Sequence, residues 1–152
     1  MLGLPLHPLI VHLAVVFLPV SALAAIAIVI RPAWSKRFGI LVVGGSLVGA
    51  VAAFISRASG QQLALQVGVS GEHLNYGTLL PLVALGFLAL VGTFWLFDRG
   101  VPGNRSRPLW LKFFGAVVVL ASVGVIALTV VTGHSGSEMV WSSIGGSTAA
   151  AQ

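Results

Sequence analysis

The four histidines are the side chains of this chain best suited to carry chemistry. His7 and His12 lie in the motif HPLIVH near the N-terminus, His73 lies in SGEH, and His134 lies in TGHSGSE. Neutral imidazole is a common ligand of haem iron, copper, zinc and non-haem iron. The chain has no cysteine, which excludes disulfides, thiolate ligands and c-type haem attachment. Histidine-ligated chemistry therefore depends on the elements that position these four residues.

Those elements are predicted to be membrane-spanning helices. Apolar residues make up 57% of the chain and charged residues only 7%, with a mean hydropathy of +1.05; soluble domains carry roughly 25% charged residues. Four apolar runs, at about 9–30, 39–58, 75–97 and 109–132, each approach the ~20 residues that cross a bilayer. The sequence predicts an all-α integral membrane protein. It is one four-transmembrane-helix bundle over residues 1–140, followed by a flexible tail at 141–152.

Basic residues predict the orientation of the bundle. Two of the segments between the helices, with Lys112 just beyond the second, account for seven of the eight Lys and Arg residues: Arg31, Lys36, Arg37, Arg99, Arg105, Arg107 and Lys112. Because basic loops stay cytoplasmic, both termini are expected to be extracytoplasmic in a multi-pass protein of the bacterial inner membrane. The net charge of +5 then reflects topology, and the expected partner is the lipid bilayer, with no nucleic acid.

This topology collects the remaining polar side chains at the extracytoplasmic ends of the helices. Arg57 continues a line of small residues, Gly45, Gly49 and Ala53, that would admit a neighbouring helix. Arg57 is therefore expected to face the bundle interior, or a gap above it, and not the lipid. The other residues at this face are His7, His12, Glu72, His73, His134 and Glu138.

Helix phase gives each histidine an expected position. Gly124, Ala127 and Val131 lead at helical spacing to His134, which would then face inward if the helix reaches it, although Gly133 and Gly136 argue for a break. Ser70 is the expected N-cap of the third helix, which places His73 in its first turn.

The first helix is expected to begin at Pro8, with His7 as the N-cap or just before it. Residues five apart on a helix diverge by ~140°, so His7 and His12 are poorly placed to bind one ion together. We expect His12 to point into the bundle about one turn down, with His7 above it. Pro19 is expected to kink the helix below.

The two end motifs resemble those of a bacterial domain-of-unknown-function family of predicted four-helix membrane proteins. Its members typically begin HPxxVHFP, end TGHxGGxLVY and carry a histidine before the third helix. The chain departs from this pattern without losing a possible ligand. Residues that match are His7, Pro8, Val11, His12, Thr132, Gly133, His134, Gly136 and Val140; those that differ are Leu13, Ala14, Ser137, Met139 and Trp141. The resemblance implies a four-helix membrane fold. Members sometimes occur fused to Rieske or cytochrome-like domains, which implies redox work.

The favoured hypothesis is a b-type haem protein that transfers single electrons. Two imidazoles from different helices can ligate haem iron axially. His12 is the expected first ligand, with His134 or His73 opposite it. Arg57 would pair with a haem propionate, and His7 would contact a propionate or support a ligand.

Two alternatives remain open. Three or four of the histidines, with Glu72 or Glu138, could instead bind copper, zinc or non-haem iron, although no HExxH motif is present. The histidines could also merely cap helices, in a cofactor-free structural subunit of a membrane redox complex. A redox partner protein or a homo-oligomer is compatible with each hypothesis. No enzyme class follows from the sequence.

Overall fold

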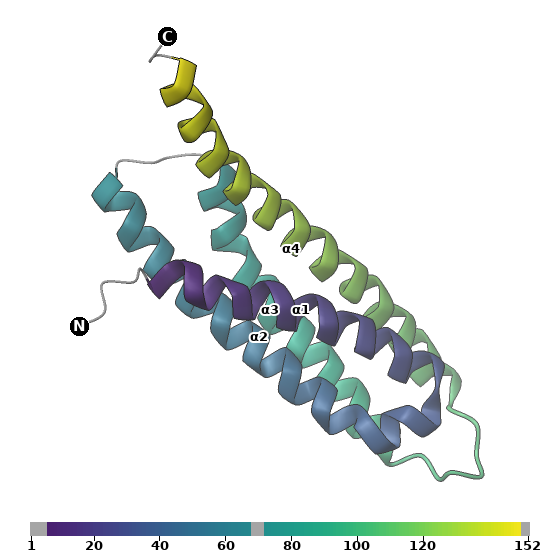
Figure 1. Cartoon of the computed structure of the whole chain (residues 1–152). Coiled ribbons are helices and arrows are strands. Elements are labelled where there is room, and N and C mark those ends of the chain that lie inside the picture. The colour runs from purple at the N-terminus through teal and green to yellow at the C-terminus, as the bar shows by residue number, and fades with distance from the viewer. Residues whose placement is uncertain (1–5, 68–71, 150–152) are drawn as a thin grey trace.

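The computed structural model describes the backbone of residues 6–67 and 72–149, and the side chains of residues 9–62 and 75–138. The described chain forms four helices: α1 (Leu6–Ile30), α2 (Pro32–Val67), α3 (Glu72–Arg99) and α4 (Leu109–Ala149). Each contains a stretch long and apolar enough to cross a membrane. The predicted all-α fold with four membrane-spanning helices is confirmed (Figure 1).

Each helix packs against the next one in the chain, and α4 also packs against α1, which closes the bundle. The turn between α1 and α2 and the loop between α3 and α4 lie at one end, and the described ends of the chain lie at the other (Figure 1). We call the first the basic end (residues 30–38 and 98–112) and the second the histidine end (residues 6–13, 57–62, 72–79 and 130–138). The expectation that both basic segments share one end is confirmed.

Several helix boundaries differ from those predicted. Arg31 alone separates α1 from α2, since Pro32 suits a first helical turn and begins α2 at once. The predicted loop at 31–38 is therefore helical from Pro32 onward, as is most of the predicted link at 59–73. At the other end of the chain, α4 continues to Ala149, across most of the expected flexible tail. An interrupted helix leaves backbone groups unpaired, which in apolar surroundings costs more than the about 1 kcal/mol that a glycine loses in helix propensity.

The start of the first helix also differs from the prediction. Because α1 begins at Leu6, His7 is not its N-cap and Pro8 is not its first residue. Pro8 is tolerated there since the first four N–H groups of a helix have no partner within the helix. The helix continues through Pro19. The predicted N-cap of the third helix, Ser70, lies outside the described residues.

Glycines on α2 allow α1 to approach closely, as the small residues predicted. A Cβ placed on Gly49 would lie 2.8 Å from Cδ2 of Leu18, and one on Gly45 would lie 2.7 Å from Oγ of Ser21. Gly39 makes the same kind of contact with α3, because a Cβ there would overlap the indole ring of Trp95. These close approaches determine how α2 packs against its two neighbours.

The tightly packed core stops short of the histidine end. Counting only the described side chains, the last buried residue toward that end is Ala14 on α1, Ser56 on α2, Leu80 on α3 and Thr129 on α4. The candidate ligands on the helices lie beyond this layer, so any site they form sits above the core.

Replacing Gly49 with alanine is expected to destabilise the bundle, whereas the same change at Gly44 is not. Both changes gain the same helix propensity, but a Cβ at Gly44 meets nothing within 4 Å. Overpacking against Leu18 should make Gly49→Ala less stable than Gly44→Ala by about 1–3 kcal/mol. Equilibrium unfolding in mixed micelles, followed by circular dichroism, measures the difference. Equal stability of the two variants would contradict the close contact between α1 and α2.

Candidate functional site at the two ends of the bundle

His12 lies on the outer surface of α1. Its side chain is exposed, on the same side of the helix as the exposed residues Leu9, Val16 and Val20. The prediction that His12 points into the bundle is therefore wrong. Ala14, two residues after His12, belongs to the buried face of α1. Two residues on a helix are ~200° apart around its axis, so His12 lies on nearly the opposite side. The imidazole is thus carried on the side of α1 that faces away from the core.

His134 also faces outward. Its side chain is 71% exposed, and Gly124, Ala127 and Val131 below it are exposed as well. The inward orientation predicted from this line of small residues is wrong. The core face of α4 instead ends at Thr129, which lies five residues from His134, or ~140° around the helix. Small residues identify a packed face only where a neighbour covers them, and a Cβ at Gly124 meets nothing within 4 Å.

Glu138 pairs with His134 one helical turn further along. The helix runs through Gly133 and Gly136, and Nε2 of His134 lies 3.2 Å from Oε1 of Glu138. The prediction of a helix break at these glycines is wrong. Because the helix continues, His134 and Glu138 lie on the same face. Both side chains are about 70% exposed, so the pair adds little stability. A carboxylate on one ring nitrogen does, however, orient the imidazole, as the hydrogen-bond partners of metal-ligating histidines do.

Arg57 is half-buried at the edge of the core. It follows the buried Ser56 and stands one turn beyond the buried Ala53, which agrees in part with the predicted inward orientation. No ion pair joins Arg57 to any side chain within 9–62 and 75–138. A partly desolvated guanidinium in this position favours an anionic partner.

The structure thus places three of the five predicted site side chains at one end, on three helices. His12, Arg57 and His134 come from α1, α2 and α4 respectively. The side chains of His7 and His73 lie outside the described ones, although their backbone belongs to the first turns of α1 and α3. Within the described residues, no three His, Asp or Glu side chains cluster closely enough to hold one metal ion. The histidine end therefore presents imidazoles on separate helices and one guanidinium.

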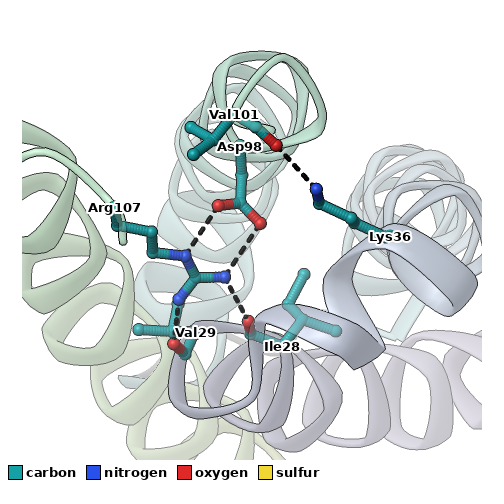
Figure 2. Close-up of polar contacts among 6 residues, drawn as sticks. All are labelled: Ile28, Val29, Lys36, Asp98, Val101 and Arg107. Carbon is teal, nitrogen blue, oxygen red and sulfur yellow. Dashed lines mark hydrogen bonds and ion pairs between the residues drawn. The ribbon is translucent and has the colours of Figure 1, made fainter. Parts of the chain in front are cut away.

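A buried ion pair at the basic end was missed by sequence reasoning. Asp98, near the end of α3, is only 1% exposed, and its carboxylate accepts two hydrogen bonds from Arg107 (Figure 2). Nε of Arg107 lies 2.6 Å from Oδ1 and Nη2 lies 2.8 Å from Oδ2. This is the two-pronged geometry in which a guanidinium matches a carboxylate.

The same guanidinium joins the ion pair to the end of α1. Arg107 donates from Nη2 to the carbonyl of Ile28 at 3.0 Å, and from Nη1 to the carbonyl of Val29. The last carbonyls of a helix lack partners within the helix and carry its negative dipole, so a cation there is favourable. Beside this group, Nζ of Lys36 donates to the carbonyl of Val101 at 2.6 Å (Figure 2). These contacts tie α1, α2, α3 and the following loop together.

One signal in the sequence could have revealed this group. Asp98 is one of only three acidic residues, and it stands at the end of an apolar run, where a carboxylate needs a partner. In the sequence, its partner Arg107 was interpreted only as one of the basic residues that determine the topology.

The family model described as a predicted membrane protein (DUF2231) matches residues 3–149. The chain belongs to this family. The match covers nearly the whole chain, including both histidine motifs and the Asp98–Arg107 pair, and it confirms the resemblance that the end motifs indicated. No curated protein and no solved structure matches the chain.

Replacing Asp98 with asparagine is expected to destabilise this DUF2231 protein strongly. The change leaves the buried Arg107 without a counter-charge, and breaking a buried pair from one side typically costs about 3–5 kcal/mol. Glu138→Gln, which removes the exposed partner of His134, is the control and should change stability by about 0–1 kcal/mol. Unfolding in micelles measures both. The double variant Asp98→Asn/Arg107→Gln should be more stable than Asp98→Asn alone. If Asp98→Asn and Glu138→Gln changed the free energy of unfolding equally, the stabilising role of the Asp98–Arg107 pair would be refuted.

Proposed function

We propose that the histidine end binds a b-type haem and that the protein transfers single electrons in the membrane. The observation that carries the proposal is the set of side chains beyond the core: exposed imidazoles on the adjacent helices α1 and α4, with the half-buried Arg57 of α2 at the same end of the bundle. Haem would need only two donors from the protein, so it would suit imidazoles that are carried singly on separate helices. When bound, haem supplies a reversible one-electron couple.

The orientation of the imidazoles indicates where such a cofactor would be held. His12 and His134 face away from the packed core, so the proposed site lies on the periphery of the bundle. His12 is the proposed first ligand, and His134 or His73 the second, with His7 close to the same helix end. The exposed apolar side chains Leu9, Leu13 and Val16 surround His12 and offer apolar contacts to a porphyrin. Arg57 would neutralise a propionate, whose charge is unfavourable near lipid.

A divalent metal is the second candidate, favoured by one specific contact. In the His134–Glu138 pair, Nε2 faces the carboxylate, which leaves Nδ1 of the imidazole as an available donor nitrogen. Copper, zinc and non-haem iron all accept imidazole with a carboxylate nearby. In this alternative, His134 and Glu138 would supply part of the ligand set, and another histidine would complete it.

An absorption spectrum of the purified protein tests the proposal. The protein, produced with haem supplied, should show a Soret band that sharpens on reduction and a resolved α band. His12→Ala should abolish the low-spin spectrum, whereas His7→Ala should mainly shift it. Arg57→Gln should weaken haemin binding about 10- to 100-fold, because a hydrogen bond to a charged group contributes about 1.5–3 kcal/mol. Arg105→Gln, at the basic end, is the matched control.

The opposite outcomes are equally clear. A colourless protein that takes up no added haemin would exclude the haem proposal. Full haem content in both His12→Ala and His7→Ala would refute the ligand assignment. Elemental analysis of the same preparation separates copper, zinc and iron. Bound copper or zinc that is lost in His134→Ala would support the second candidate.

We further propose that the histidine end is extracytoplasmic, in the bacterial inner membrane, because most basic residues lie at the opposite end. The chain has no cysteine, so single-cysteine variants can be labelled without removing native thiols. A membrane-impermeant maleimide should label Gln61→Cys in intact spheroplasts, but Arg105→Cys only after lysis. Both positions are exposed. The reverse labelling pattern would invert the orientation and move the proposed site to the cytoplasmic face.

A further inference from the structure

An apolar pocket lies between α1 and α2 at the basic end. Its volume is about 270 Å³. On α2 it is lined by one face of the helix, and on α1 by two alanines and an isoleucine. The lining residues are Trp34, Phe38 and Val42 from α2, and Ala24, Ala27 and Ile28 from α1. Trp34 and Phe38 are exposed, so the pocket opens on the outside of the bundle.

Two arginines stand over the aromatic side chains of the pocket. The guanidinium carbon of Arg31 lies 4.7 Å from the ring centre of Trp34, and that of Arg37 lies 5.2 Å from the ring centre of Phe38. Such stacking holds each cation at the edge of the pocket while leaving its N–H groups available.

The chain itself offers these two arginines no anion. It has only three acidic residues against eight Lys and Arg. Asp98 is engaged by Arg107, Glu138 pairs with His134, and Glu72 begins α3 at the opposite end. Arg31 and Arg37 must therefore take their counter-charge from outside the chain.

The length of the pocket fits within one leaflet of a bilayer. From Trp34 to Val42, its first and last lining residues on α2, is about 12 Å of helix. One leaflet contributes about 15 Å, half of the ~30 Å hydrocarbon core of a membrane. The volume is just below the about 300–1,000 Å³ of sites that enclose a whole small molecule. The pocket therefore suits one flexible chain lying along the helices, with its charged head at the arginines.

We propose that this pocket binds an anionic phospholipid, with one acyl chain between α1 and α2 and its phosphate at Arg31 and Arg37. The proposal is independent of the cofactor at the histidine end. Basic pockets between transmembrane helices are suited to anionic lipid headgroups. The bound lipid would cover the exposed rings of Trp34 and Phe38 and would neutralise both cations.

Native mass spectrometry of the full chain with two added lipids tests the proposal. Dioleoylphosphatidylglycerol and dioleoylphosphatidylcholine have the same acyl chains, so the difference in their binding isolates the effect of charge. The phosphatidylglycerol should bind about tenfold or more tightly. Arg31→Gln/Arg37→Gln should weaken its binding about 25-fold, at roughly fivefold for each arginine near an anionic headgroup. The matched control is Arg99→Gln/Arg105→Gln, which removes equal charge at the same end but away from the pocket.

Filling the pocket provides a second, independent test. Ala27→Phe should displace the bound lipid, whereas Ala89→Phe, on the exposed face of α3, should not. If circular dichroism shows that Ala27→Phe is unfolded, Ala24→Leu serves the same purpose. The proposal would be overturned if both arginine double variants lost the same affinity for phosphatidylglycerol, or if the two lipids bound equally well. It would also be overturned if the variants with a filled pocket still bound the lipid fully. Displacement by the chain-free headgroup glycerophosphoglycerol would also overturn it, because the acyl chain would then contribute nothing.

Discussion

The guanidinium of Arg107 is the contact on which the arrangement of the bundle most depends. It reaches from the α3–α4 loop to a carboxylate on α3, nine residues earlier, and to the last carbonyls of α1, 78 and 79 residues earlier. A carboxylate as buried as Asp98 is unfavourable without a charged partner, and carbonyls at a helix end need donors. One side chain meets both requirements. Because helices in lipid gain little from the hydrophobic effect, a polar contact of this kind contributes specificity that apolar packing alone does not.

Close helix approach along the glycines of α2 complements that ion pair. Gly45 and Gly49 bring α1 against α2, and Gly39 admits Trp95 from α3. Van der Waals packing of this kind weakens steeply with distance, so it is effective only where the backbones come near. The ion pair and the glycine contacts stabilise different parts of the bundle. The ion pair holds the basic end, the glycine contacts hold the middle, and the described core ends at Ala14, Ser56, Leu80 and Thr129. The histidine end is thus the part of the bundle with the least internal packing.

The two ends differ in what they offer to other molecules. The histidine end presents nitrogen donors, which suit a metal or haem, while the basic end presents stacked arginines beside an apolar pocket, which suit an anionic amphiphile. The second feature reflects the scarcity of acidic residues, since three carboxylates cannot balance the charge of eight Lys and Arg side chains. A membrane protein of this composition takes its counter-charges from lipid or from a bound cofactor.

Composition and hydrophobic run length alone determined the four membrane-spanning helices and the grouping of seven basic residues at one end. These properties are local, since each depends on the types of a few neighbouring residues. The orientation of His12 and His134 was decided only by the tertiary structure, because a helix face becomes a core face only when another helix covers it. The same holds for Asp98 and Arg107: they lie nine residues apart in the chain, and the loop between them and the end of α1 had to be positioned before they could form one contact.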